Sequence, residues 1–366
     1  MSACRSMPLR QAASILRGLT GAVLLGALSI GTPAAHADAP VIPLGKVIVH
    51  DPMMIRDGAI WYLYGTGRGI PVYSSADLVH WHPRPRVFQA APAWAHRTIK
   101  GFDGSIWAPE VAHVDGRYVL YYAVSAFKKN TSAIGVATNV TLDSSSPRYH
   151  WVDHGIVVQS MPYRDLWNAI DPAVIRGRDG GLWMAFGSFW AGLKMVKLRA
   201  DGLRLATPQQ WYGIARRERP PFFPETRPGP AAEEAPYVFR HGGWYYLFVS
   251  WDYCCRGVKS NYKVMVGRSR SVHGPYVDRS GKPMEQGGGT LVVGGDALYP
   301  GVGGNGVITS GGTDYLVFHA YDASDHGMPK LKIKALHWSA DGWPSVSQAE
   351  LDRPGLGRSG HTGTAK

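Results

Sequence analysis

The chain has 366 residues, and 39 lysines and arginines against 27 aspartates and glutamates give it a formal net charge of +12. The basic residues are scattered without a Lys/Arg block, so the charge does not indicate a nucleic-acid partner. Only three cysteines occur, which excludes a fold held together by a disulfide framework. We therefore expect a protein whose stability comes from an apolar core.

The N-terminus has the pattern of a secretory signal peptide, which we place at residues 1–37. Three arginines lie before residue 18, an apolar segment covers 19–30, and Ala35-His36-Ala37 offers a small-x-small cleavage site. No later segment has the roughly 20 apolar residues that a transmembrane helix needs. We therefore predict a secreted, soluble protein, extracellular or periplasmic, with no membrane partner.

Five segments of the remaining chain share one pattern, a tight glycine turn followed by a run of β-branched, aromatic or aliphatic residues. They are 56–67, 114–125, 178–189, 240–251 and 310–321. Such runs predict β-strands, and a second apolar strand follows most of them. Repeats about 60 residues apart that each hold several short strands predict an all-β, five-bladed β-propeller, which we place at 38–350. A sandwich or a β-helix fits less well, because the repeats are long and contain paired hairpins.

The segment before each glycine turn should be the first strand of a blade, which lines the central channel of a propeller. Four of these segments carry a carboxylate at nearly the same point, and the fifth carries an amide: Asp51, Glu110, Asp171, Glu234 and Asn305. Grouped carboxylates repel one another, and at least one pKa is pushed upward. Two kinds of site fit such a group, a cation site or the acid and base of glycoside hydrolysis.

Several motifs, most of them at the head of a repeat, resemble family 43 of the glycoside hydrolases, specifically its arabinan endo-1,5-α-L-arabinosidases. The resemblance covers about residues 45–345. The motifs are HDP at 50–52, SIWAPEV at 105–111, NAIDP at 168–172, GSFWAG at 187–192, EAPYV at 234–238, DYCCRG at 252–257 and FHAYD at 318–322.

This resemblance implies roles for three of the carboxylates. Asp51 would be the general base that activates a water molecule, and Glu234 the general acid that protonates the leaving oxygen. Asp171 would orient the acid and keep its pKa high. Inversion requires the acid and base to stand roughly 6.5–9.5 Å apart. Glu233 is the rival acid, but alternate strand residues face opposite ways, and Glu234 fits the E-A-P pattern; for Glu110 we expect a supporting hydrogen bond.

The resemblance also suggests residues that bind the sugar. Trp107 and Phe127 would be platforms for sugar rings, and Asn168 and Ser188 would be hydrogen-bond donors near the scissile bond. Phe189 belongs to the aromatic residues that adjoin the acidic positions. His50 precedes the base and either orients the substrate or the carboxylate, or is simply packed.

One histidine, His319, resembles the residue that faces a metal ion in the channel of the family, commonly calcium. A single imidazole with several waters would be an unusual calcium shell, because calcium prefers oxygen ligands. Sodium or a water cluster therefore remains an alternative to a calcium cofactor.

Three further segments leave questions open. Cys254 and Cys255 are neighbours, and in an export compartment they form either a vicinal disulfide or two free thiols. The Pro-rich segment 220–233 leads into Glu234 and should be a loop at the rim of the cleft. The polar, Gly-rich residues 351–366 should be a disordered tail.

The sequence therefore predicts a secreted, monomeric hydrolase that cuts internal α-1,5 links of arabinan, with this polysaccharide as its partner. An exo-acting arabinofuranosidase or a β-xylosidase of the same family is the first alternative, because the same acidic triad would serve it. A carbohydrate-binding propeller without catalysis is the second.

Overall fold

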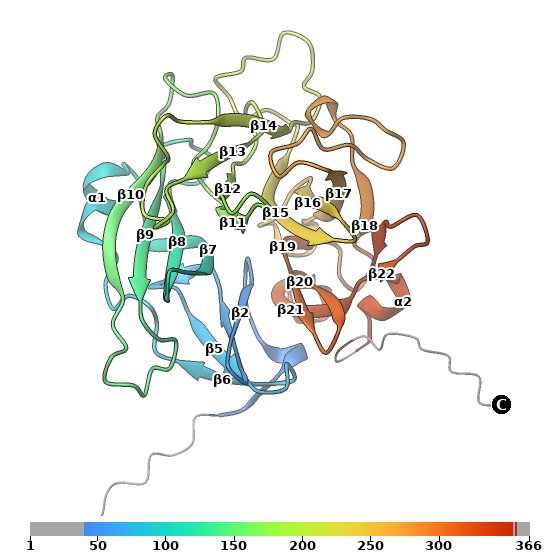
Figure 1. The fold of residues 1–366 in the computed structure, drawn as a ribbon. Helices are drawn as coiled ribbons and strands as arrows, with labels where there is room; N and C mark the ends of the chain where they lie inside the picture. The colour runs from blue at the N-terminus through green and yellow to red at the C-terminus, as the bar shows by residue number, and fades with distance from the viewer. Residues whose placement is uncertain (1–39, 354–355, 357–366) are drawn as a thin grey trace, which may run out of the picture. The chain divides into compact units, whose positions relative to one another are not determined.

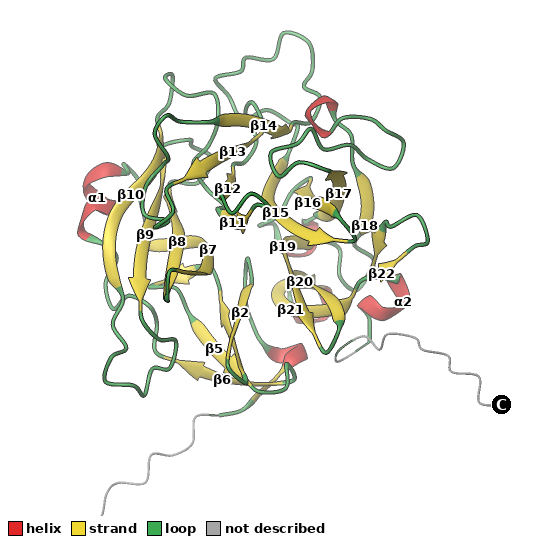
Figure 2. Ribbon diagram, viewed as in Figure 1, coloured by secondary structure: helices red, strands yellow, loops and turns green. Residues whose placement is uncertain are grey.

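A computed structural model of the chain describes residues 40–353 and 356. The predicted signal peptide at 1–37 lies outside these residues. Strands make up nearly all of the regular secondary structure of the described part, and its antiparallel sheets form a ring around a central axis (Figure 1). Its two α-helices are short, α1 (Ala93–Thr98) and α2 (Gln348–Leu351), and neither is long and apolar enough to cross a membrane (Figure 2).

Five sheets form the blades and confirm the predicted five-bladed propeller. Blade 1 has the order β1-β6-β5-β3-β2, with β1 (Ile42–Pro43), β2 (Met53–Asp57), β3 (Ile60–Tyr64), β5 (Val72–Ser75) and β6 (His80–Arg84). Blade 2 has the order β10-β9-β8-β7-β4, with β4 (Gly67–Arg68), β7 (Ser105–Val114), β8 (Arg117–Ser125), β9 (Ser132–Asn139) and β10 (Val152–Ser160).

The other three blades keep their strands in chain order. Blade 3 consists of β11 (Ala173–Arg176), β12 (Leu182–Phe186), β13 (Leu193–Leu198) and β14 (Trp211–Ala215). Blade 4 consists of β15 (Glu233–His241), β16 (Trp244–Trp251), β17 (Lys263–Ser269) and β18 (Thr290–Val293). Blade 5 consists of β19 (Val302–Ser310), β20 (Thr313–Asp322) and β21 (Met328–Ala335), and a small separate sheet pairs β22 (His337–Trp338) with β23 (Pro344–Ser345).

The ring closes through the start of the described chain. The segment Val47–Val49 runs beside β21, where the Leu331 N–H donates to the Val47 carbonyl at 2.9 Å and the Val49 N–H donates to the Pro329 carbonyl at 3.1 Å. It thus adds a strand-like edge to blade 5, whereas β2 of blade 1 begins only at Met53. The sequence predicted that the segment before the first glycine turn is the first strand of one blade, and the structure divides this segment between two blades.

The apolar core consists of five clusters, one between each pair of neighbouring blades. Burial of a leucine or phenylalanine side chain contributes roughly 1.5–3 kcal/mol, so these contacts hold the blades together without a disulfide framework. Leu351, at the end of α2, is fully buried in the cluster between blades 4 and 5. The predicted tail boundary at Leu351 therefore falls inside a packed helix, and residues 354–355 and 357–366 of that tail lie outside the described part.

Each blade begins with the same local backbone, which sets the positions of the site residues. One residue at each head has a left-handed φ: Asp51 (50°), Ala108 (39°), Asp171 (56°), Ala235 (53°) and Gly304 (61°). A proline follows the first four, and Asn305 follows the fifth. β-Bulges lie at the same points in β7, β15 and β19, and such bulges re-aim side chains.

This register corrects the sequence alignment of the acidic residues. Asp51 and Asp171 share the left-handed position, whereas Glu234 stands one residue before it and Glu110 two residues after it. The carboxylates are therefore not equivalent: Glu110 lies inside the strand β7, while Asp51, Asp171 and Glu234 lie at or before the bend. We call the end of the channel at which these first strands begin the mouth.

Candidate active site

Asp51 is the most strongly hydrogen-bonded of the three mouth carboxylates. Its Oδ2 accepts from Thr66 Oγ1 at 2.6 Å and lies 2.8 Å from His50 Nδ1, and its backbone N–H donates to His319 Nδ1 at 3.2 Å. Burial alone would raise the pKa of Asp51, but the His50 imidazole and the hydrogen bonds from His50 and Thr66 lower it below its usual value. Asp51 is therefore ionised at neutral pH.

Glu234 lies across the mouth on blade 4 and is held by two hydroxyl groups. Tyr262 Oη donates to its Oε1 at 2.6 Å and Ser188 Oγ donates to its Oε2 at 3.1 Å. Burial raises the pKa of Glu234 and the charge of Asp51 raises it further, whereas the two hydroxyl donors lower it in part. The net effect is a raised pKa, as a general acid requires.

Asp171 accepts a hydrogen bond from a backbone amide, the Ala235 N–H, which lies 3.0 Å from its Oδ2. Burial and then the neighbouring charges of Glu234 and Asp51 raise its pKa well above the usual range. The three carboxylates thus interact electrostatically although they come from three different blades.

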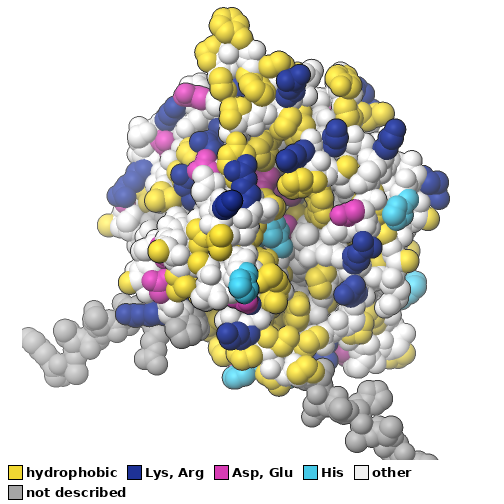
Figure 3. All heavy atoms as spheres, turned by 180° about the vertical axis from the view of Figure 1, so that it is seen from behind, with side chains coloured by type: hydrophobic (Ala, Val, Ile, Leu, Met, Phe, Trp, Pro, Cys, Tyr) yellow, Lys and Arg dark blue, Asp and Glu magenta, His cyan; other side chains and the backbone are white. Residues whose placement is uncertain are grey.

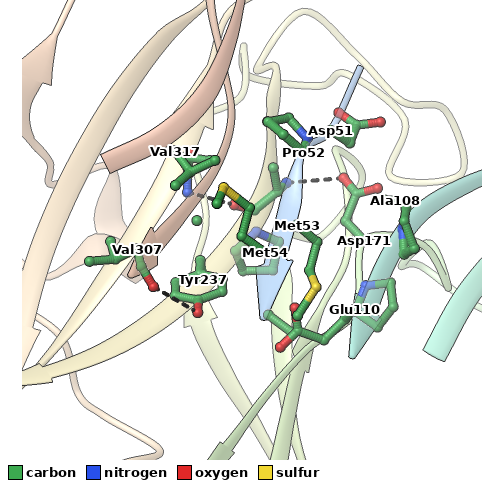
Figure 4. Close-up of a pocket in the computed structure, with 18 of the residues that line it drawn as sticks. Asp51, Pro52, Met53, Met54, Ala108, Glu110, Asp171, Tyr237, Val307 and Val317 are labelled. Atoms are coloured by element: carbon green, nitrogen blue, oxygen red, sulfur yellow. Dashed lines mark hydrogen bonds between the residues drawn. The ribbon is translucent and has the colours of Figure 1, made fainter. Parts of the chain in front are cut away.

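A pocket continues from Asp51 and Asp171 along the channel and contains Glu110 (Figure 4). Glu110 is buried, its Oε1 lies 3.3 Å from the Val174 N–H, and burial raises its pKa to about 8. The predicted supporting role fits this placement. On the side opposite to that of Figure 1, acidic and histidine side chains lie near the middle of the face, with lysines and arginines around them (Figure 3).

Glu233, the rival acid, faces away from the mouth. It is buried, its Oε1 accepts from Trp251 Nε1 at 2.8 Å, and burial raises its pKa to about 7. The alternation of side chains along β15 therefore separates the two adjacent glutamates, as predicted.

The predicted sugar-binding residues fall into two groups. Trp107 and Phe189 are partly exposed and Phe127 is 63% exposed, so these three rings are accessible. Ser188 and Asn168 are buried: Ser188 donates to Glu234, and Asn168 Oδ1 accepts from Ser132 Oγ at 2.6 Å. The oxygen of Ser188 thus contacts the predicted acid directly.

Three residues that contact the carboxylates or His50 were absent from the predicted site. Thr66 and Tyr262 donate to Asp51 and Glu234, and Tyr321 Oη lies 2.8 Å from His50 Nε2. Tyr321 belongs to the FHAYD motif and Thr66 is the second-last residue of the first repeat, so both had a sequence signal. Tyr262 had none, because it comes from the third strand region of blade 4.

His319 is fully buried and stacks on His50 with ring centroids 4.0 Å apart. Because its Nδ1 accepts from the Asp51 N–H, a neutral ring carries its proton on Nε2, a buried atom with no hydrogen-bond partner among the described residues. A protonated Nε2 fits a water molecule, whereas a cation would require the other tautomer. The described donors therefore fit calcium poorly, and the ion stays a prediction.

Cys254 and Cys255 form a vicinal disulfide in the turn after β16. The Pro-rich segment before Glu234 is a loop, as predicted. Arg219 holds it through its guanidinium, which donates to the carbonyl groups of Trp190, Pro224, Arg227 and Pro228 at 2.8–3.0 Å.

Comparisons with known proteins agree with this geometry. An extracellular exo-α-(1→5)-L-arabinofuranosidase of Cellvibrio japonicus is 52% identical over 307 residues, which cover 84% of this chain and 88% of that protein. An extracellular endo-α-(1→5)-L-arabinanase of Bacillus subtilis is 41% identical over 325 residues, which cover 88% of this chain and 94% of that protein. A solved structure of the Cellvibrio cellulosa α-L-arabinanase with arabinohexaose has a TM-score of 0.82 at 52% identity, covering 84% of this chain and 97% of that one.

The family model of the glycosyl hydrolases family 43 matches residues 40–344, which include all five blades and every carboxylate of the mouth. The protein therefore belongs to family 43 and is a glycoside hydrolase.

Proposed function

We propose that the protein hydrolyses the α-1,5-linked L-arabinofuranosyl chain of arabinan, with inversion at the anomeric carbon. The observation that carries this proposal is the contrast between Asp51, whose pKa is lowered, and Glu234, whose pKa is raised, at one mouth. Two carboxyl groups with pKa values pushed apart provide a base and an acid at the same pH. The likeness to an arabinanase that binds arabinohexaose supports arabinan as the substrate.

In the proposed reaction, the ionised Asp51 takes a proton from a water molecule that attacks the anomeric carbon. Protonated Glu234 gives its proton to the leaving glycosidic oxygen as that bond breaks. Asp171 interacts electrostatically with both carboxyl groups and orients the acid. Thr66 and His50 keep the base in place, and Tyr262 and Ser188 keep the acid in place.

Internal cleavage is the mode we propose, because the resemblance to endo-arabinanases extends over the whole propeller. The exposed rings of Trp107, Phe127 and Phe189 would then support sugars on either side of the scissile bond. Exo cleavage is the second candidate, which the name of the Cellvibrio japonicus relative favours. A propeller that only binds carbohydrate is set aside, since the family is a family of hydrolases.

We also propose that the protein is exported and acts as a monomer. The extracellular names of two relatives and the signal-like pattern of residues 1–37 support export.

The test is incubation of the purified protein with linear 1,5-α-L-arabinan while viscosity and product lengths are followed together. Endo cleavage predicts a fast loss of viscosity with mixed short oligosaccharides, and exo cleavage predicts slow loss with one small product. The configuration of the first product, followed by polarimetry or NMR, tests inversion. Activity on xylan without activity on arabinan would overturn the substrate assignment.

A further inference from the structure

The disulfide Cys254–Cys255 lies next to the catalytic mouth rather than in the core. Cys255 is exposed, and its Sγ lies 3.7 Å from His50 Nε2 and 3.9 Å from Tyr321 Oη. A vicinal bridge closes no long loop, so the usual stabilisation through loop closure is small. The position of the disulfide beside the mouth therefore has to be explained by something other than stability.

A chain of hydrogen bonds runs from this turn to Asp51. The Cys255 N–H donates to Tyr321 Oη at 2.8 Å, and Tyr321 Oη lies 2.8 Å from His50 Nε2. Burial lowers the pKa of His50, but the charge and hydrogen bond of Asp51 raise it above its usual value. A charged ring carries protons on both nitrogens, and a neutral ring that accepts from the Tyr321 hydroxyl at Nε2 carries its proton on Nδ1. In both forms the Nδ1–H faces Asp51 Oδ2 at 2.8 Å. The turn thus fixes the hydroxyl, the hydroxyl fixes the ring, and the ring donates to the carboxylate.

The oxidation state of the cysteines affects this chain. A disulfide sulfur carries no proton and cannot donate to His50 Nε2, so Tyr321 is the donor to that atom among the described residues. In the reduced protein a thiol could also donate to His50, because one ring nitrogen of His50 and both sulfurs lie within 4.8 Å of one another. A Cys255 thiol could then donate to Nε2 in place of Tyr321, and the turn that presents the Cys255 amide would lose its covalent constraint.

We propose that the Cys254–Cys255 disulfide and Tyr321 are positioning groups for the reaction, which hold His50 with its Nδ1–H directed at Asp51. The inference rests on the proposed role of Asp51 as base and adds a redox requirement to it: the oxidised protein is the fully active form. The two sulfurs act through Tyr321 and His50 and need not touch the reacting atoms.

The first experiment reduces the bridge in the purified, full-length mature enzyme with a water-soluble phosphine. The phosphine becomes its oxide with an oxygen from water, and the two electrons and two protons convert the disulfide to two thiols, which a thiol reagent counts. We expect kcat on linear arabinan to fall about tenfold, with KM within about twofold, and air oxidation to restore it. The double variant Cys254→Ser, Cys255→Ser should have the low kcat before and after phosphine.

The second experiment removes the hydroxyl. Tyr321→Phe should lower kcat about tenfold without a matching change in KM, and phosphine should lower it little further, because both changes break the same chain. Tyr315→Phe is the matched control, since it removes a hydroxyl from the same strand β20 and should leave kcat unchanged. Nitrogen-15 NMR of the imidazoles should show the Nδ1–H form of His50 lost in Tyr321→Phe.

Reduced enzyme with two additional titrated thiols and an unchanged kcat would overturn the inference, and so would a change confined to KM, which would indicate a substrate contact instead. Asp51→Asn in the same assay separates this from a failure of the proposed function. If that variant keeps its activity, the assignment of the base is wrong; if it is inactive while reduction has no effect, only the redox inference is wrong.

Discussion

Asp51 and Asp171 are both aspartates at the same position of two blades, yet their pKa values are shifted from the usual value in opposite directions. Both precede a proline and have a left-handed φ, 50° and 56°. Asp51 is held by Thr66 and His50 and its pKa is lowered, whereas Asp171 is held by one backbone amide and its pKa is raised. The repeated backbone places the carboxylate, and the neighbours determine its protonation.

The largest expected effect is at the ionised member of this pair. Asp51→Asn removes both the charge and the proton acceptor, so kcat should fall by about 10²–10⁴, the range of general acid and base catalysis. Release of reducing sugar from linear arabinan measures the change, and circular dichroism checks the fold. Asp115→Asn, at a left-handed turn position of blade 2, is the control that should leave kcat unchanged.

A smaller effect is expected at the second member. Because the pKa of Asp171 is raised, it holds a proton to higher pH, and asparagine is a close substitute for a protonated carboxyl group. Asp171→Asn keeps an oxygen for the Ala235 amide and should lower kcat only about tenfold at neutral pH. Equal losses in Asp171→Asn and Asp51→Asn would show that the two carboxyl groups have the same protonation state, which would contradict their opposite pKa shifts.

Thr66→Val should shift the pKa of Asp51 upward, toward that of Asp171. The change removes the 2.6 Å hydrogen bond that favours the ionised form, so the pKa of Asp51 should rise. Since the base must be deprotonated, the acidic limb of kcat/KM against pH should move to higher pH by about one unit or less, with little change at pH 7 and above. Thr309→Val, which removes a similar hydroxyl bond to Asp314, should leave the profile in place; an unmoved limb in Thr66→Val would contradict the account.

The smallest effect concerns Glu110, a carboxyl group with one backbone contact and no catalytic role in the proposal. Its pKa in the folded protein is raised to about 8, so stability is lost as pH rises from the unfolded value near 4.5 toward 8. Glu110→Gln removes this loss. Its melting temperature should match that of the wild type near pH 4.5 and exceed it by about 2–4 °C at pH 8; the same difference at both pH values would exclude this explanation.

The repeated strands were predictable because their signal is local. Glycine turns followed by apolar runs correspond to β3, β8, β12, β16 and β20, and the motifs at the blade heads identified Asp51, Asp171 and Glu234 as neighbours. The offsets of one and two residues among the acidic positions were not predictable. They depend on left-handed φ values at Ala108 and Ala235, which alanine disfavours and only the surrounding sheet imposes.

The partners of the carboxylates were harder to predict for another reason. Tyr262 reaches Glu234 from 28 residues away, and Tyr321 reaches His50 from 271 residues away. The Tyr321 contact depends on how blades are arranged around the axis, and the Tyr262 contact depends on how the strands of blade 4 pack. A single sequence carries no record of either. The protonation pattern of the mouth follows from these partners, so the sequence predicted which residues meet and not how each would titrate.

The contact between blades 5 and 1 determines when, during folding, the active site is assembled. Val47–Val49 pairs with β21, near the end of the described chain, and Asp51 follows two residues later with its amide on His319 of the same blade. The base can therefore take its final position only when the earliest and the latest parts of the propeller have met. A nascent or C-terminally truncated chain that lacks blade 5 would contain Asp51, Asp171 and Glu234, yet have no assembled site.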